Sequence, residues 1–127
     1  MEPQRVTRKL TVVFHADVQG YSRLIGEDEV TTLRTVASHL EMMRTLVKQH
    51  GGRAIGSRGD SLLAEFPSVV EAVQCAVEMQ RELKGRNAEL PTDRRIEFRM
   101  GINLNRTPGD WHRGALADRS MVTRPIV

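Results

Sequence analysis

The sequence has few aromatic residues, one cysteine and no long apolar run, and each shortage narrows what the protein can be. Aromatic side chains make up 4% of the 127 residues, so a core must be built mostly from Leu, Val, Ile, Ala and Met. Cys75 is the sole cysteine, which excludes a disulfide within the chain. No apolar run approaches the roughly 20 residues that span a bilayer, and the first ten residues lack a signal-peptide pattern. These shortages predict a cytoplasmic protein with no membrane segment.

A strong excess of one charge is also missing. Charged residues make up 28% and hydrophobic residues 39% of the chain, an ordinary balance for a globular protein. The formal net charge is only +3, and the basic residues are not gathered in one stretch. Because nucleic-acid binding needs a concentrated basic patch, we expect no nucleic-acid partner. The length fits one domain.

Alternating and clustered apolar residues predict four strands. In residues 9–16 Leu10, Val12 and Phe14 share one face and Val13 lies on the other, which suits a central strand, and residues 96–104 alternate between apolar and polar positions. Residues 53–66 contain two short apolar runs around the turn sequence 57–60, which is typical of a hairpin.

Two segments have the three- and four-residue apolar spacing of helices. The first covers about residues 26–50 and ends at the glycine pair 51–52, a common helix stop. The second opens at Ser68, which has capping-box spacing with Glu71, and is expected to end near residues 84–85. The predicted apolar faces consist of Leu33, Val36, Ala37, Leu40, Met43, Leu46 and Val47 in the first helix, and of Val69, Val73, Ala76, Val77 and Leu83 in the second.

The predicted order is strand, helix, strand, strand, helix, strand. This is the α+β, ferredoxin-like βαββαβ pattern, an antiparallel sheet with helices on one face. The pattern ends near residue 104, which predicts a domain over residues 1–104. Residues 105–127 lose the apolar spacing and are rich in Pro, Gly, Arg and Asp, a composition typical of a disordered or loosely packed tail.

Two aspartates follow predicted strands at places where their carboxylates can converge. Asp17 comes just after the first strand, and Asp60 lies at the hairpin turn. In the βαββαβ pattern the first strand lies beside the strand that follows Asp60, so the two side chains are expected to approach each other. Neighbouring carboxylates repel, and a divalent cation removes that conflict. Mg²⁺ characteristically takes one or two carboxylates with phosphate oxygens and water.

The segment after Asp17 has features of a phosphate-binding loop. Residues 18–22, Val-Gln-Gly-Tyr-Ser, join a strand to a helical region. Gly20 permits a close backbone approach, and free N–H groups at the start of a helix attract phosphate. Such a loop can hold a triphosphate while Asp17 holds its metal.

Simpler interpretations compete with each of these signals. Isolated aspartates at strand ends are usually turn or cap residues. His15 shares a strand face with Asp17; it is either a third metal ligand, a group that tunes the pKa of Asp17, or a hydrogen-bonded histidine of the sheet. The acidic run 27–29 is either a second cation site or a solvated helix start that favours the helix dipole.

Three segments, in this order, resemble one family closely: HADVQGYSRLIGEDE, HGGRAIGSRGDSLLAEFPSVVEAVQCAVEMQ and LPTDRRIEFRMGINL. They are similar to bacterial class III adenylate cyclase domains, and the resemblance covers about residues 8–104. The family fold also begins with a βαββαβ unit.

The resemblance implies a role for each matching position. Asp17 and Asp60 would bind two Mg²⁺ or Mn²⁺ ions, and Val18 would lend a backbone carbonyl to one of them. The nucleotide, ATP or GTP, would lie along Gln19, Gly20, Tyr21 and Ser22, with Gly59 beside it. The implied reaction is attack of the ribose 3′-oxygen on the α-phosphate, which releases pyrophosphate and a cyclic nucleotide.

The chain departs from the family pattern in three places. Residues 56–58 are Gly-Ser-Arg where the family often has a Lys-Thr-Thr triplet whose Lys helps select adenine. Ser61 stands where Gly is common. Residues 105–127 match neither the family's second base-selecting segment nor its Asn and Arg, four positions apart, that stabilise the transition state; Arg113 and Arg119 lack such an Asn. The catalytic pair is therefore unassigned, and the tail resembles a truncation or a shifted reading frame.

These departures leave three hypotheses. The first is a cyclase catalytic domain, incomplete in this chain and inactive alone, which would work in a homodimer or with a complementary cyclase domain because the family's active site lies between two subunits. The second is a non-catalytic module that binds nucleotide and metal, or that only dimerises. The third, an unrelated ferredoxin-like binding domain, is disfavoured by the ordered segments.

Overall fold

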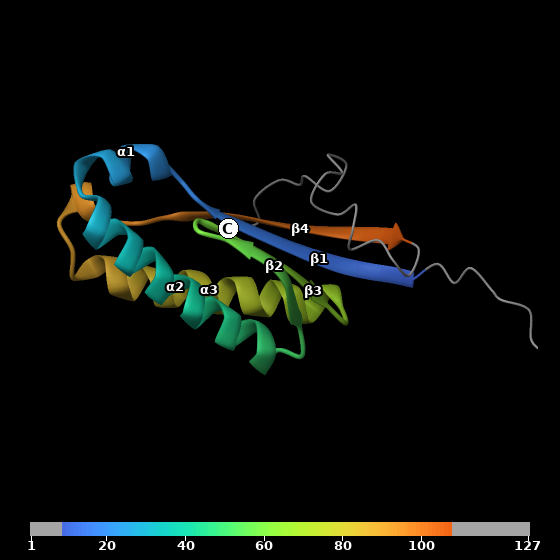
Figure 1. Ribbon diagram of the computed structural model, residues 1–127. Helices are drawn as coiled ribbons and strands as arrows, with labels where there is room; N and C mark the ends of the chain where they lie inside the picture. Colours follow the sequence, from blue (N-terminus) through green and yellow to red (C-terminus); the bar gives the residue numbers. More distant parts are fainter. Residues whose placement is uncertain (1–8, 108–127) are drawn as a thin grey trace, which may run out of the picture.

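A computed structural model (Figure 1) describes residues 9–107 of the chain. Four strands and three α-helices follow one another, with a short 3₁₀ helix before the last strand. Their bounds are β1 Lys9–Val18, α1 Tyr21–Glu27, α2 Glu29–Gln49, β2 Arg53–Arg58, β3 Ser61–Phe66, α3 Val69–Ala88, η1 Thr92–Arg94 and β4 Phe98–Thr107. The last strand continues three residues past its predicted end, and the predictions for 108–127 lie outside the described residues.

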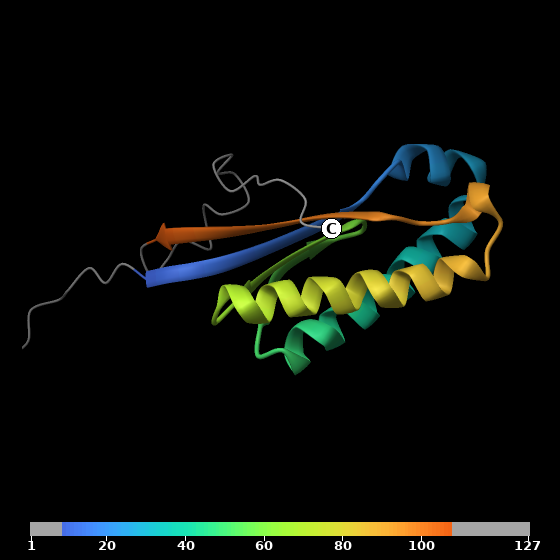
Figure 2. The ribbon, with the colours of Figure 1, turned by 180° about the vertical axis from the view of Figure 1, so that it is seen from behind.

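The strands form one antiparallel sheet in the order β2-β3-β1-β4. Figures 1 and 2 show α2 and α3 side by side against one face of this sheet. The predicted α+β, ferredoxin-like βαββαβ arrangement is therefore confirmed. It places β1 centrally, between β3 and β4, so the end of β1 is bordered by both neighbours.

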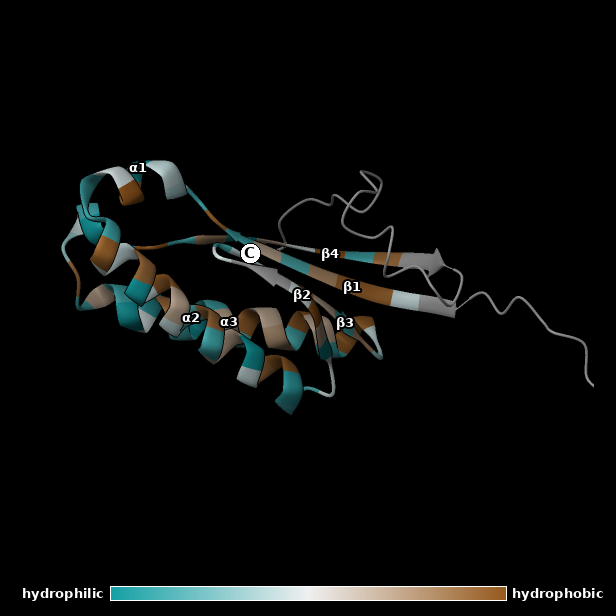
Figure 3. Cartoon of the chain, in the orientation of Figure 1, coloured by the Kyte–Doolittle hydropathy of each residue, from teal (hydrophilic) through white to brown (hydrophobic). Residues whose placement is uncertain are grey.

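Strand alternation sends one half of β1 into the core. Val12, Phe14, Ala16 and Val18 face the helices and are buried, because successive side chains point to opposite faces. Apolar residues recur along the sheet and both long helices (Figure 3). The helices contribute buried residues at helical spacing: Val36, Leu40, Met43 and Val47 from α2, and Ala72, Cys75, Ala76, Met79 and Leu83 from α3.

The first predicted helix is two helices, which corrects its start at Gly26. α1 already begins at Tyr21, and the chain breaks at Asp28, whose backbone is extended. The Asp28 carboxylate accepts a hydrogen bond from the Thr31 amide at 3.1 Å, which caps α2. Leu33, which was predicted to lie on the apolar face of this helix, is 43% exposed.

The second predicted helix begins as expected but ends later. Ser68 caps α3 and accepts from the Glu71 amide at 3.2 Å. The helix passes Gly85 and reaches Ala88; a glycine there costs about 1 kcal/mol, and the burial of Leu83 offsets it. The buried face is rotated from the prediction, since Val69 is exposed and Met79 is buried.

The ends of α2 and the hairpin agree with the sequence prediction. Gly51 has a left-handed φ of 76°, and the Gly52 amide donates to the Val47 carbonyl at 2.8 Å, the closing bond of a glycine-terminated helix. β2 and β3 are joined by Gly59 and Asp60 alone. No helix within residues 9–107 combines the length and apolar character needed to cross a membrane.

Candidate metal and nucleotide site

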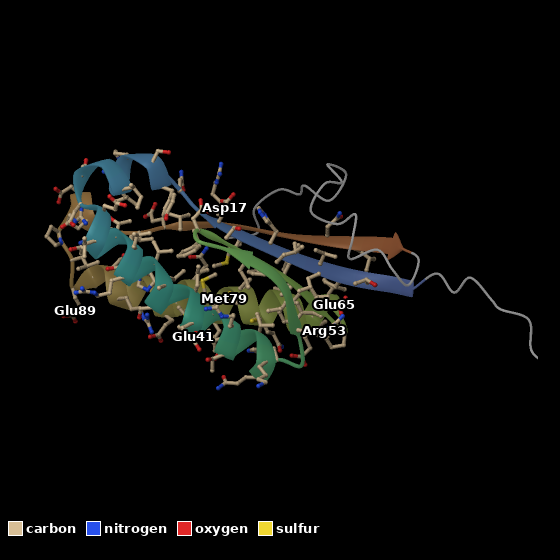
Figure 4. The ribbon with its side chains drawn as sticks, in the orientation of Figure 1. Asp17, Glu41, Arg53, Glu65, Met79 and Glu89 are labelled. Atoms are coloured by element: carbon tan, nitrogen blue, oxygen red, sulfur yellow. The ribbon has the colours of Figure 1, made fainter. Side chains whose placement is uncertain are left out.

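The structure brings the backbones of the two predicted aspartates to the same end of the sheet. Asp17 pairs with Ser61 in the β1–β3 ladder, so Asp60 is one residue beyond its partner. The Val18 amide donates a 3.0 Å hydrogen bond to the Asp60 carbonyl, which ties the hairpin turn to the end of β1. Asp17 lies near that end, on the side of the sheet away from α2 and α3 (Figure 4).

Arg99 is a member of this site that the sequence reasoning missed. It faces Asp17 directly in the β1–β4 ladder. Its Nε donates to Asp17 Oδ1 at 3.1 Å and its Nη2 to Oδ2 at 3.3 Å, so the guanidinium engages both carboxylate oxygens. The available signal was the polar position of Arg99 within the alternating strand, but its register against Asp17 could not be read from sequence.

His15 lies on the Asp17 face of β1, as strand alternation predicted. Its Nε2 is 3.9 Å from Asp17 Oδ2, and half of its side chain is exposed. That separation is too long for a hydrogen bond. The metal-ligand and tuning roles of His15 therefore remain predictions.

The predicted phosphate loop is a tight turn between β1 and α1. Gly20 has a left-handed φ of 69°, a conformation that glycine adopts without steric cost. The Gln19 amide donates to the Glu97 carbonyl at 2.8 Å. A Cβ placed on Gly59 would lie 3.8 Å from the Tyr21 hydroxyl, so the loop packs over the hairpin turn. Ser22, in the first turn of α1, is exposed.

Side chains from α3 hold the segment that supports this loop. The Asn87 side chain makes two hydrogen bonds to the backbone of Ile96. Its Nδ2 donates to the Ile96 carbonyl at 2.9 Å, and its Oδ1 accepts from the Ile96 amide at 3.0 Å. Gln80 donates to the Phe98 carbonyl at 3.3 Å. These bonds fix the residues on either side of Glu97, whose carbonyl binds Gln19. A groove of about 590 Å³ opens beside Gln19 between this segment and α3.

The donor set around Asp17 suits a hard divalent cation better than a soft one. Asp17 offers carboxylate oxygens, the ligands that Mg²⁺ and Mn²⁺ prefer, while Arg99 contacts both of these oxygens and His15 Nε2 lies 3.9 Å from one of them. Among residues 9–107 no group of three or more His, Cys, Asp or Glu side chains is arranged to hold a metal. An ion bound here would therefore take its remaining ligands from phosphate, backbone or water.

The acidic run 27–29 has a structural role at the junction of α1 and α2. Asp28 caps α2, and the hydrogen bond from the Thr31 amide lowers its carboxyl pKa. Arg94 of η1 approaches Glu27 at 3.7 Å and Asp28 at 4.0 Å. Asp28 at the N-cap and Glu29 in the first turn of α2 agree with the helix-start interpretation, and Arg94 supplies a cation beside the run.

Comparison with known proteins supports the predicted resemblance. No family model matches the sequence. The chain is 40% identical over 105 residues to "Putative adenylate cyclase 3" of Rhizobium meliloti (strain 1021), covering 82% of this chain and 18% of that protein. It is 33% identical over 104 residues to "Serine/threonine-protein kinase pkn2" of Myxococcus xanthus, covering 81% and 12%. The chain therefore spans less than a fifth of either curated relative.

Solved structures give the same result for the fold. An adenylate/guanylate cyclase/hydrolase from Silicibacter pomeroyi superposes with a TM-score of 0.72 at 32% identity, covering 82% of this chain and 61% of that one. The adenylyl cyclase CyaB from P. aeruginosa gives a TM-score of 0.65 at 27% identity, covering 80% and 59%. The fold is that of a nucleotide cyclase domain. In sequence and in structure, this chain resembles the class III adenylate and guanylate cyclases over about four fifths of its length.

Proposed function

We propose that the chain provides the metal-binding half of a class III cyclase active site. Asp17 and Asp60 would hold Mg²⁺ or Mn²⁺, and residues 18–22 would hold the triphosphate of ATP or GTP. The observation that carries this proposal is the 3.0 Å bond from the Val18 amide to the Asp60 carbonyl, because it joins both aspartate-bearing segments at one end of the sheet. Similarity to proteins named as adenylate cyclases supports it.

The chemistry of the site would be positioning and charge neutralisation rather than covalent catalysis. When bound, two divalent ions would activate the ribose hydroxyl and neutralise the phosphates. Asp17 and Asp60 would supply the anionic ligands, with the carbonyl of Val18. The left-handed backbone of Gly20 would let the loop turn closely around a phosphate. A Cβ placed on Gly59 would lie 3.8 Å from the Tyr21 hydroxyl, so both residues would border the triphosphate.

The other half of the family's site has no counterpart in this sequence. No Asn is followed by Arg four positions later in the 127 residues, and Gly56 stands where a base-selecting Lys is common. A glycine has no side chain with which to contact a base. We therefore propose that the 127-residue chain does not turn over nucleotide alone, and that a complementary cyclase domain would complete the site across a dimer interface.

The same departures favour one second candidate, a module that binds nucleotide and metal, or only dimerises, without catalysis. The test is production of cyclic AMP from ATP and cyclic GMP from GTP with Mn²⁺, with and without a complete cyclase domain, together with direct measurement of ATP binding. We expect no product from the chain alone, and product above the partner's own level in the mixture.

Asp17→Ala and Asp60→Ala serve as matched variants in this assay. Product from the mixture that disappears with either variant would support a half-site. Metal-dependent ATP binding without product in the mixture would favour the non-catalytic module. Cyclic nucleotide made by the chain alone, and lost in the aspartate variants, would contradict the proposed incompleteness. Equal binding by the wild-type chain and both variants would refute the metal site.

A further inference from the structure

We infer that Arg99 is an internal competitor for the metal: its guanidinium occupies the Asp17 carboxylate in the metal-free protein and must release it when a divalent cation binds. This inference rests on the proposed function, since it concerns the same carboxylate. It adds a residue that sets how tightly the site binds metal.

The position of Arg99 is fixed by the sheet. Asp17 and Arg99 are direct partners in the antiparallel β1–β4 ladder, and directly opposite residues project from the same face. Nε and Nη2 of Arg99 meet the two different oxygens of Asp17, at 3.1 and 3.3 Å. This is the two-pronged geometry in which arginine binds carboxylates most specifically.

A divalent ion and this guanidinium require the same oxygens. The ion must approach carboxylate lone pairs that the Arg99 N–H groups now use, and a fixed positive charge beside Asp17 also repels it. Among the described contacts Arg99 pairs with the Asp17 carboxylate, and His15 Nε2 lies 3.9 Å from Oδ2 of the same group. Metal binding at Asp17 therefore includes the cost of breaking the Arg99 pair.

The exposure of the pair makes the exchange reversible. The Arg99 side chain is 59% exposed and the Asp17 side chain 25%, so water can solvate the guanidinium once it is displaced. Exposed ion pairs contribute little, and the usual range corresponds to roughly a 1.5- to 5-fold change in an equilibrium constant. Arg99 should thus weaken metal binding by a few-fold without blocking it.

Arg99 also places a positive charge beside Asp17 when no metal is bound. The guanidinium neutralises Asp17 while the 3.0 Å bond between the Val18 amide and the Asp60 carbonyl is in place. The negative charge of Asp17 would thus be neutralised in both states, by the guanidinium in the metal-free protein and by the metal ion in the metal-bound protein.

The experiment measures Mn²⁺ binding to the 127-residue chain by calorimetry and by the electron paramagnetic resonance signal of free Mn²⁺, without nucleotide. Arg99→Gln should lower the Kd by about 2- to 5-fold. Arg99→Lys keeps the charge but lacks the rigid two-pronged guanidinium, so its Kd should lie between those of the wild type and Arg99→Gln. Arg95→Gln is the matched control, because it removes an equal charge from an arginine that donates to the Leu90 carbonyl instead.

An unchanged Kd in Arg99→Gln, with Asp17→Asn still abolishing binding, would overturn the inference while leaving the proposed metal site intact. Binding that survives Asp17→Asn unchanged would overturn both. If Arg99→Lys binds only as weakly as the wild type, charge alone acts and occupancy of the oxygens is refuted. A similar gain in Arg95→Gln would likewise refute a specific role for Arg99.

Discussion

Replacing His50 by alanine should destabilise the protein in a strongly pH-dependent way. His50 is the C-terminal cap of α2, and its ring reaches across to α3. Nδ1 lies 3.1 Å from Glu71 Oε1 and Nε2 lies 2.9 Å from Glu78 Oε2. Because the two glutamates are seven residues apart, they lie on the same face of α3. When protonated, the imidazole donates to both and joins the two helices.

The size of the effect follows from the exposure of the partners. The His50 side chain is 15% exposed, but Glu71 and Glu78 are 42% and 50% exposed, so each pair is worth less than a buried charged hydrogen bond. With solvent screening, two such pairs and the favourable position of a cation at a helix C-terminus contribute about 1.5 kcal/mol. For a domain of this size that corresponds to a fall in Tm of about 6–12 °C.

The direction of the pH dependence follows from the pKa of His50. The hydrogen bond to Glu78 raises this pKa above its ordinary value of 6.5. Partial desolvation of the ring lowers the pKa, but the hydrogen bond to Glu71 raises it further, so the net shift is upward. A raised pKa in the folded state means that the stabilisation is complete below pH 6.5 and is lost as pH rises through the folded-state pKa. The difference in Tm between wild type and His50→Ala should therefore be large at pH 6 and small at pH 9.

The assay is thermal unfolding followed by circular dichroism at both pH values, in a reducing buffer that protects Cys75. Glu78→Gln is the matched variant, and a double-mutant cycle with His50→Ala isolates the pair. A Tm difference between wild type and His50→Ala that is the same at pH 6 and pH 9 would refute the charged bridge. So would additive effects in the cycle.

Two further predictions concern the core and the end of α2. His39 is 3% exposed. Its burial and, to a lesser extent, the positive charge of Arg86 lower its pKa to about 4. As pH falls, His39 is therefore protonated in the unfolded state before it is protonated in the folded state. Stability measured by urea unfolding should fall by about 2 kcal/mol from pH 7.5 to pH 5 through this group, and His39→Leu should remove that part. Gly52→Ala should cost about 1–3 kcal/mol, because a Cβ there would lie 2.7 Å from Phe66 and 2.9 Å from the Glu65 carbonyl. Gly85→Ala, with no atom within 4 Å of its Cβ, should instead be stabilising; equal effects of the two glycine substitutions on the urea midpoint would contradict the steric reasoning.

Local sequence signals predicted most of the elements correctly. Helix stops and caps are local interactions, so Gly51 marked the C-terminal end of α2 and Ser68 marked the start of α3. The hairpin turn likewise followed from Gly59 and Asp60. The signals failed where burial decides. Gly85 looked like a helix end, yet α3 continues to Ala88 because packing against the sheet outweighs the cost of one glycine.

The sequence by itself determined the βαββαβ order, the places of Asp17 and Asp60 and the resemblance to class III cyclases, because alternation, helical spacing and short motifs are local properties. Only the tertiary structure decided which residue faces Asp17. Arg99 is far from Asp17 in sequence, and it reaches the carboxylate through the β1–β4 register. A register shift of one residue would send that side chain to the other face of the sheet. Strand pairing therefore places a positive charge, the Arg99 guanidinium, against Asp17, one of the two predicted metal ligands.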